Sequence, residues 1–207
     1  MGTELSLEHR FTDNDPAAPV LLLLHGTGGG PDDLRAVGRE ICPDAAVLAP
    51  AGPVSEQGMA RWFRRLSEGV FDTEDVRRQA GRLADFLLAA RERYGFEDRR
   101  VVAVGFSNGA NIAAATVLLR PDALTEAVLF AAMDPVPDPP GHDLSGSRVL
   151  LSNGQRDPMA PLDSARRLVE SLREHSAAVH EHWHEGGHQI TPEGVRQARD
   201  WLTGETG

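Results

Sequence analysis

Three residues that lie far apart in the chain have the types and the order that nucleophilic catalysis requires. Ser107 lies in "GFSNG", which fits the pattern G-x-S-x-G between an apolar run and a small-residue stretch typical of a helix. A serine hydroxyl is a poor nucleophile until a base removes its proton. Asp157 and His188 follow Ser107 in the order serine, acid, histidine that accompanies this motif. The sequence therefore predicts a catalytic triad.

Each member of this triad follows a predicted strand. Ser107 follows the run 100–106, Asp157 follows 148–154, and His188 follows 178–185 just ahead of a helical pattern. The carboxyl ends of parallel strands meet at one edge of a sheet, where ligand sites of α/β proteins gather. Asp134 also follows a strand, at 126–132, and is the alternative acid, although its neighbours "DPVPDPP" are typical of a turn.

A tetrahedral intermediate would also need donors for its oxyanion. The stretch "HGTGGGPDD" follows the apolar run 20–25, and its glycines let backbone N–H groups approach a small anion. The expected donors are the backbone N–H groups of Thr27 and Asn108. A flexible turn is the alternative interpretation of this stretch. A phosphate-binding loop is excluded because the chain has no Lys and the glycine spacing fits neither nucleotide motif.

Other residues of chemical interest favour structural roles. His180, His182 and His184 alternate along one predicted strand and could suggest a metal site. No Cys or carboxylate stands at a matching ligand spacing beyond the adjacent Glu181 and Glu185, so we expect a strand face and no metal or cofactor. Cys42 is the single cysteine, which excludes an intrachain disulfide and is expected to be a packed thiol.

The elements that must position these residues alternate along the chain. Short apolar runs predict strands at 4–11, 20–25, 45–50, 100–106, 126–132, 148–154 and 178–185. Amphipathic or small-residue stretches with start and stop signals predict helices at 31–42, 72–95, 107–121, 161–176 and 191–202. This alternation predicts one α/β domain over residues 1–207, with a mostly parallel sheet and helices on both faces.

Composition narrows the class of protein. The 207 residues carry a net charge of −10, which argues against nucleic acid as a partner. The longest apolar run is far shorter than the roughly 20 residues of a membrane span, and we find no secretory signal. We therefore expect a cytoplasmic protein that acts on a small molecule.

The sequence resembles the small bacterial carboxylesterases of the phospholipase/carboxylesterase family, which are related to acyl-protein thioesterases. The resemblance runs from Leu21 to Leu202 and includes "LLHGTGGGPDDL", "GFSNGANIAAA", "NGQRDPMAPL" and "GGHQIT". "RWFRR" followed by "EGVFD" resembles the branch linked to hydroquinone and quinone resistance. The resemblance implies a minimal α/β-hydrolase fold without a cap domain, with Ser107 as nucleophile, Asp157 as acid and His188 as base.

The resemblance also implies that the segment around Arg61 borders the acyl pocket. The residues expected in the substrate pocket are Gly28, Trp62, Phe63, Met133 and Met159. Ordinary loop packing is an equal alternative for the two aromatic residues. Ala51 stands in "LAPAGPV", where many relatives have a basic residue, and this departure puts the substrate preference in doubt.

The expected activity is hydrolysis of small carboxylic esters or thioesters through an acyl-enzyme, with no cofactor. A lysophospholipase or acyl-protein thioesterase is the alternative, but long acyl chains need a deep apolar groove, whereas the Arg-rich segment 61–65 favours a polar rim. A non-catalytic binding module on a hydrolase scaffold is a further alternative. Relatives in this family often pair, which implies a homodimer.

Overall fold

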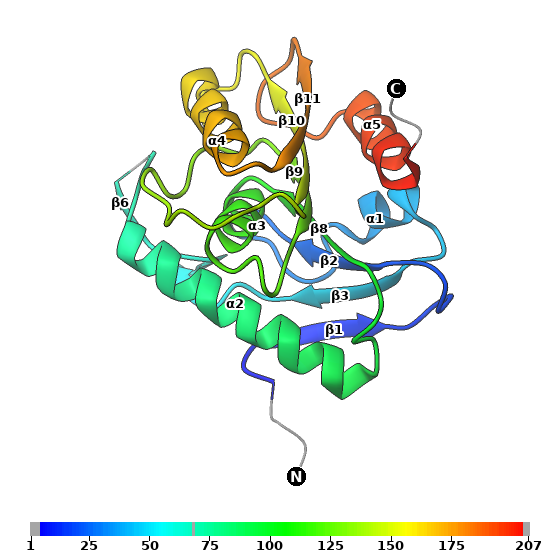
Figure 1. Cartoon of the computed structure of the whole chain (residues 1–207). Coiled ribbons are helices and arrows are strands. Elements are labelled where there is room, and N and C mark those ends of the chain that lie inside the picture. The colour runs from blue at the N-terminus through cyan, green and yellow to red at the C-terminus, as the bar shows by residue number, and fades with distance from the viewer. Residues whose placement is uncertain (1–4, 68, 205–207) are drawn as a thin grey trace.

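A seven-stranded sheet runs through the centre of the molecule (Figure 1). The computed structural model describes residues 5–67 and 69–204. The strands of the sheet are β1 (His9–Thr12), β2 (Val20–Leu24), β3 (Ala46–Pro50), β8 (Val101–Phe106), β9 (Glu126–Phe130), β10 (Arg148–Gly154) and β11 (Ala178–His184). Their spatial order is β1-β3-β2-β8-β9-β10-β11, and all neighbours are parallel except the antiparallel pair β1–β3.

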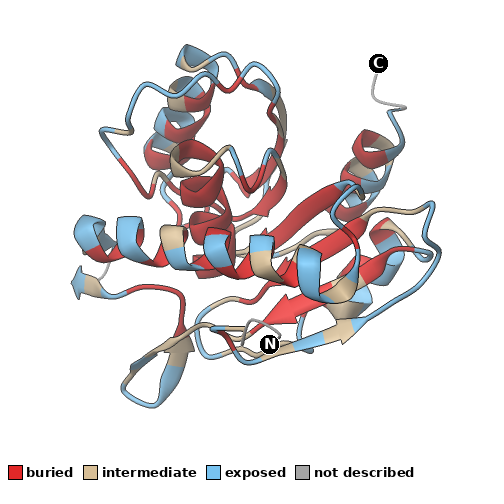
Figure 2. Ribbon diagram, turned by 60° about the horizontal axis from the view of Figure 1, so that its bottom comes forward, coloured by how far each residue is buried: buried red, intermediate tan, exposed pale blue. Residues whose placement is uncertain are grey.

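Within the described ranges, five helices cover the two faces of this sheet (Figure 1). The helices are α1 (Arg35–Ile41), α2 (Thr73–Tyr94), α3 (Asn108–Leu119), α4 (Leu162–Glu174) and α5 (Pro192–Thr203). One hydrophobic cluster joins the sheet to α2, α3 and α4, and a second joins it to α1 and α5. Figure 2 shows the central strands and α3 as the most buried elements. The sheet and its helices confirm the predicted layers.

Local chemistry sets the ends of the longest helix. The Asp72 side chain caps α2 by accepting a hydrogen bond from the N–H of Asp75. Gly95 ends the helix with a φ of 68°, in the left-handed region that glycine adopts without steric cost. These two signals explain why the predicted range 72–95 is close to the observed helix.

Several observed elements are shorter than predicted. The first strand begins at His9 and not at residue 4, which lies outside the described residues. Helix α1 begins at Arg35 because residues 30–34 form turns with hydrogen bonds between residues three apart, such as Asp33 N–H to the Gly30 carbonyl. Strand β9 ends at Phe130 because Ala131 turns out of the sheet with a φ of 54°.

The connection from β3 to α2 contains two small hairpins that the sequence did not predict. They are β4 (Val54–Glu56) with β5 (Met59–Arg61), and β6 (Arg65–Ser67) with β7 (Val70–Phe71). Strands of two or three residues are too short to leave a periodic pattern.

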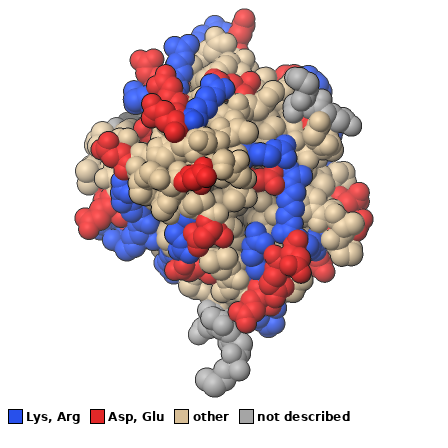
Figure 3. Space-filling view, in the orientation of Figure 1, with Lys and Arg blue, Asp and Glu red and all other residues tan. Residues whose placement is uncertain are grey.

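The surface carries charges of both signs. On the face drawn in Figure 3, basic and acidic side chains are interspersed and no basic patch forms. Across the described residues, no helix is both long enough and apolar enough to cross a membrane.

Candidate active site

Ser107 occupies a strained turn between β8 and α3. Its φ of 54° and ψ of −118° are rare for a residue with a side chain and cost about 1–3 kcal/mol. Its N–H donates to the carbonyl of Phe130 at 2.9 Å, which helps to hold the turn. A Cβ on Gly105 would lie 2.5 Å from the carbonyl oxygen of Gly109, and one on Gly109 would overlap the carbonyl oxygen of Leu24. Close packing of α3 on the sheet therefore explains both glycines of "GFSNG".

The loops after β10 and β11 bring an acid and a base to this serine. His188 Nε2 lies 2.8 Å from Ser107 Oγ, and His188 Nδ1 lies 2.7 Å from Asp157 Oδ2. The Asp157 side chain is fully buried, and its other oxygen accepts the N–H groups of Met159 and Ala160. A carboxylate accepts from Nδ1–H, so Nε2 is left as an acceptor facing the serine hydroxyl.

Asp134, the alternative acid, has a different partner. Its Oδ1 accepts the N–H of Val136, and in the described part of the chain it makes no hydrogen bond to His188. Burial raises the pKa of Asp134, partly offset by the hydrogen bond from Val136 and the charge of Arg167. The geometry thus favours Asp157 as the partner of the imidazole.

The loop that carries Thr27 is fixed by a buried histidine that the sequence reasoning missed. His25 Nδ1–H donates to the Gly26 carbonyl at 2.7 Å, and His25 Nε2 accepts the N–H of Gly52 at 2.9 Å. The Trp62 indole N–H donates to the His25 carbonyl at 2.9 Å. The only sequence signal for this role was the His-Gly pair that follows β2. The pair does not reveal that His25 bonds to Gly52 and Trp62, which come from another part of the chain. These contacts hold Thr27 beside the N-terminus of α3.

Asn108 is the first residue of α3, and N–H groups in the first turn of a helix lack an acceptor within the helix. Its side-chain Oδ1 accepts the backbone N–H of Trp62 at 2.7 Å. Both expected oxyanion donors, Thr27 and Asn108, border the same cavity as Ser107.

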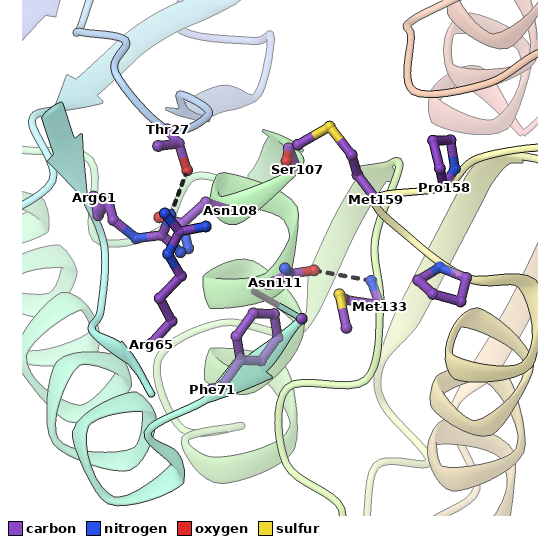
Figure 4. Close-up of a pocket in the computed structure, with 12 residues that line it drawn as sticks. Thr27, Arg61, Arg65, Phe71, Ser107, Asn108, Asn111, Met133, Pro158 and Met159 are labelled. Carbon is purple, nitrogen blue, oxygen red and sulfur yellow. Dashed lines mark hydrogen bonds between the residues drawn. The ribbon is translucent and has the colours of Figure 1, made fainter. Parts of the chain in front are cut away.

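This cavity has a volume of about 310 Å³ (Figure 4). Its lining consists of Thr27, Arg61, Arg65, Gly69, Phe71, Ser107, Asn108, Asn111, Met133, Pro158, Met159 and Pro161. Met133 and Met159, expected in the pocket, are among these residues. Sequence reasoning named Arg65 only as part of the Arg-rich segment 61–65 and did not single out Gly69, Phe71, Asn111 or the two prolines. The carboxyl-terminal edge of a sheet does not specify which loop side chains turn inward.

The other residues expected in the pocket lie elsewhere. Trp62 and Phe63 are not part of the lining and are almost fully buried in the core, with 1% and 0% of their surface exposed. Their large aromatic surface drives them beneath the loop, where Trp62 braces both Asn108 and the His25 carbonyl. Gly28 lies outside the lining, with its N–H bonded to the Ala60 carbonyl.

Known proteins share this architecture. The family model described as phospholipase/carboxylesterase matches residues 11–204. The chain belongs to the phospholipase/carboxylesterase family. It is 44% identical over 182 residues to the hydrolase MhqD of Bacillus subtilis, covering 88% of this chain and 91% of MhqD.

Solved structures agree with this assignment. The Bacillus cereus carboxylesterase is 39% identical, with a TM-score of 0.93 over 97% of this chain and 95% of that one. A carboxylesterase from Mesorhizobium loti is 29% identical, with a TM-score of 0.90 over 98% and 97%. The predicted α/β-hydrolase fold and family are confirmed, and the protein is a carboxylesterase-type hydrolase.

Two arginines give this family member's cavity a cationic wall. Arg61 is only 4% exposed, and its Nη1–H donates to Thr27 Oγ1 at 3.0 Å. Arg65 donates through Nε to Glu56 Oε1 at 2.6 Å, and the same carboxylate lies 3.6 Å from Arg61. Burial lowers the pKa of Arg61, Glu56 raises it and Arg65 lowers it again. An arginine remains charged under these influences.

The remaining residues singled out from the sequence have structural contacts. His182 Nδ1 lies 2.9 Å from Ser152 Oγ, and His184 Nδ1 accepts the N–H of Gly186. The described residues contain no group of three or more metal-binding side chains. Cys42 is a half-buried free thiol that packs against the cluster under α1 and α5. Ala51 lies outside the cavity lining, and its N–H donates to the Glu8 carbonyl.

Proposed function

We propose that the protein hydrolyses small carboxylic esters or thioesters through an acyl-enzyme on Ser107. The observation that carries the proposal is the continuous chain of hydrogen bonds from Ser107 through His188 to Asp157, with distances of 2.8 and 2.7 Å. At its Ser107 end, this series of hydrogen bonds borders a cavity large enough for a small ligand. Family membership supports esterase activity and leaves the substrate open.

In the first half of the reaction, Ser107 Oγ attacks the carbonyl carbon of the ester, and His188 Nε2 takes the hydroxyl proton. The Asp157 carboxylate holds Nδ1–H and stabilises the imidazolium that forms. The backbone N–H groups of Thr27 and Asn108 stabilise the oxyanion. His188 then gives its proton to the leaving alcohol or thiol as the bond to the carbonyl carbon breaks.

In the second half, water takes the place of the leaving group. His188 removes a proton from this water, whose oxygen attacks the acyl carbon. The second tetrahedral intermediate collapses as Ser107 regains the proton from the imidazolium. The free acid leaves, and the enzyme returns to its starting state without a cofactor.

The test is turnover of 4-nitrophenyl esters over a series of acyl lengths, with Ser107→Ala as the key variant. We expect short esters to be cleaved fastest, because the cavity volume of about 310 Å³ is at the small end for ligand sites. Ser107→Ala should abolish turnover and labelling by a fluorophosphonate. Unchanged turnover in this variant would remove Ser107 from its role, and a preference for long acyl chains would favour a lysophospholipase or thioesterase.

A further inference from the structure

The reaction proposed above does not explain why two arginines line the cavity. The lining contains the guanidinium groups of Arg61 and Arg65, and no carboxylate from the described residues lines it. Glu56 contacts both arginines from outside the lining. One carboxylate shared between two cations leaves a net positive charge on this wall.

The charge of Arg61 is largely removed from water, because its side chain is almost fully buried. Removing a guanidinium from water is costly unless it is paired and hydrogen-bonded. Its Nε and Nη1 donate to the Phe63 carbonyl and to Thr27 Oγ1, at 3.3 and 3.0 Å. These contacts leave Nη2 with no acceptor among the described residues. Arg65 likewise uses only Nε, for Glu56, so that further donors remain on this wall.

One of the two asparagines at the base of the cavity also presents a donor. Asn108 Oδ1 accepts the N–H of Trp62, and Asn111 Oδ1 accepts the N–H of Met133 at 2.9 Å. Both side-chain oxygens are thus occupied, which orients each amide with Nδ2 as the remaining group. Asn108 Nδ2 is almost inaccessible and therefore does not face the cavity. The Asn111 amide lines the cavity, so its Nδ2 can donate a hydrogen bond to an acceptor on a bound molecule.

The opposite wall of the cavity is apolar. In Figure 4, Met133, Pro158 and Met159 lie on the other side of Ser107 from Thr27, Arg61 and Arg65. An ester placed with its carbonyl carbon at Ser107 extends in two directions, one along each wall. One half of the substrate therefore contacts the cationic wall, and the other half contacts the apolar wall.

We propose that the substrate is an ester with a free carboxylate on one half, held by Arg61 and Arg65, and with an apolar second half that packs on Met133 and Met159. The proposal rests on the hydrolase function proposed above and names its substrate class. A planar guanidinium can donate two parallel hydrogen bonds to a carboxylate, which is stronger and more specific than a single neutral bond.

The experiment measures kcat/KM for two pairs of esters that differ in charge and little in shape. In the first pair the acyl half varies, with 4-nitrophenyl hemisuccinate against 4-nitrophenyl 4-methylpentanoate. In the second pair the alcohol half varies, with 4-acetoxybenzoate against 4-acetoxybenzamide. Uncatalysed hydrolysis is subtracted for each ester. The pair with the larger ratio of anionic to neutral kcat/KM identifies which half lies along the arginines.

Arg65→Met is the test variant and Arg64→Met is its matched control. Arg64 lies in the same segment, but its side chain is 59% exposed and does not line the cavity. In the wild type, at least one ratio should exceed about tenfold, and Arg65→Met should lower it by about tenfold, the size expected for one charged hydrogen bond. Arg64→Met should leave the ratio unchanged.

The proposal would be overturned by a wild type that hydrolyses these esters without favouring either anion, or by an equal change of the ratio in both variants. Salt dependence keeps the test decisive if Arg65→Met does not fold, because the wild-type ratio must fall between about 0.02 and about 0.5 M salt. A constant ratio also overturns it. A wild type that neither cleaves the esters nor reacts with a fluorophosphonate at Ser107 would refute the hydrolase function itself, which is a distinguishable failure.

Discussion

Replacing Asp157 by Asn tests the proposed role of the buried carboxylate most directly. The Asn side chain has almost the same shape, and its Oδ1 can still accept the N–H groups of Met159 and Ala160, now 2.8 and 3.0 Å from Asp157 Oδ1. The amide nitrogen then faces His188 Nδ1, where the carboxylate oxygen now lies at 2.7 Å. A donor in that position requires Nδ1 to be the acceptor.

The imidazole would therefore carry its hydrogen on Nε2, which faces Ser107 at 2.8 Å and could no longer take the serine proton. The wrong tautomer typically lowers kcat by about 10⁴, which corresponds to about 5.4 kcal/mol of transition-state stabilisation. The assay is single-turnover hydrolysis of a short 4-nitrophenyl ester, with circular dichroism to confirm the fold.

Asp134→Asn is the matched control, because Asp134 is the other acid that follows a strand at this edge of the sheet. Its Oδ1 accepts the Val136 N–H, an interaction that Asn can keep, so kcat should not change. The reasoning is refuted if Asp157→Asn keeps wild-type turnover, or if the large loss appears in Asp134→Asn instead.

Three further predictions concern the scaffold. Gly109→Ala should lower the free energy of unfolding by about 2–4 kcal/mol, because the added Cβ overlaps a carbonyl of β2. Gly81→Ala should raise it by up to about 1 kcal/mol, because the added Cβ meets open space in α2. Urea titration measures both changes. Trp62→Phe removes the indole donor to the loop that carries Thr27, and should lower kcat about tenfold with little change in KM; a change confined to KM would contradict this role. Burial lowers the pKa of His182 below 6.5 in the folded protein. As the pH falls, His182 therefore binds a proton more readily in the unfolded chain than in the folded one, and the free energy of unfolding decreases below about pH 6.5. Unfolding titrations between about pH 7 and about pH 5 should show a shallower slope for His182→Gln, and an identical slope would exclude this contribution.

The sequence was most informative where one local rule decides the structure. Continuous apolar runs are required of strands covered on both faces, so the bounds of β2, β8 and β10 could be predicted to within one residue. Parallel strands then place the loops after them at one edge, which explains why the sequence alone predicts that residues 107, 157 and 188 meet.

The sequence was least informative in the segment 51–71. Its hairpin strands have two or three residues, and the direction of each side chain depends on contacts with distant parts of the chain. The family resemblance implied that Trp62 lines the pocket, and loop packing was the equal alternative. The Asn108 amide and the His25 carbonyl hold Trp62 in the core. Arg61 turns toward Thr27 for a similar reason, because its hydrogen-bond partner comes from another loop.

The position of Trp62 makes the geometry of the expected oxyanion donors depend on a small part of the fold. A single residue braces both the helix start at Asn108 and the glycine loop after β2, and it belongs to a segment of short hairpins outside the main sheet. Segments with few ladder bonds open at lower free energy than a central sheet. Local opening of this segment would therefore disturb both expected oxyanion donors, Thr27 and Asn108, even while the main sheet stays folded.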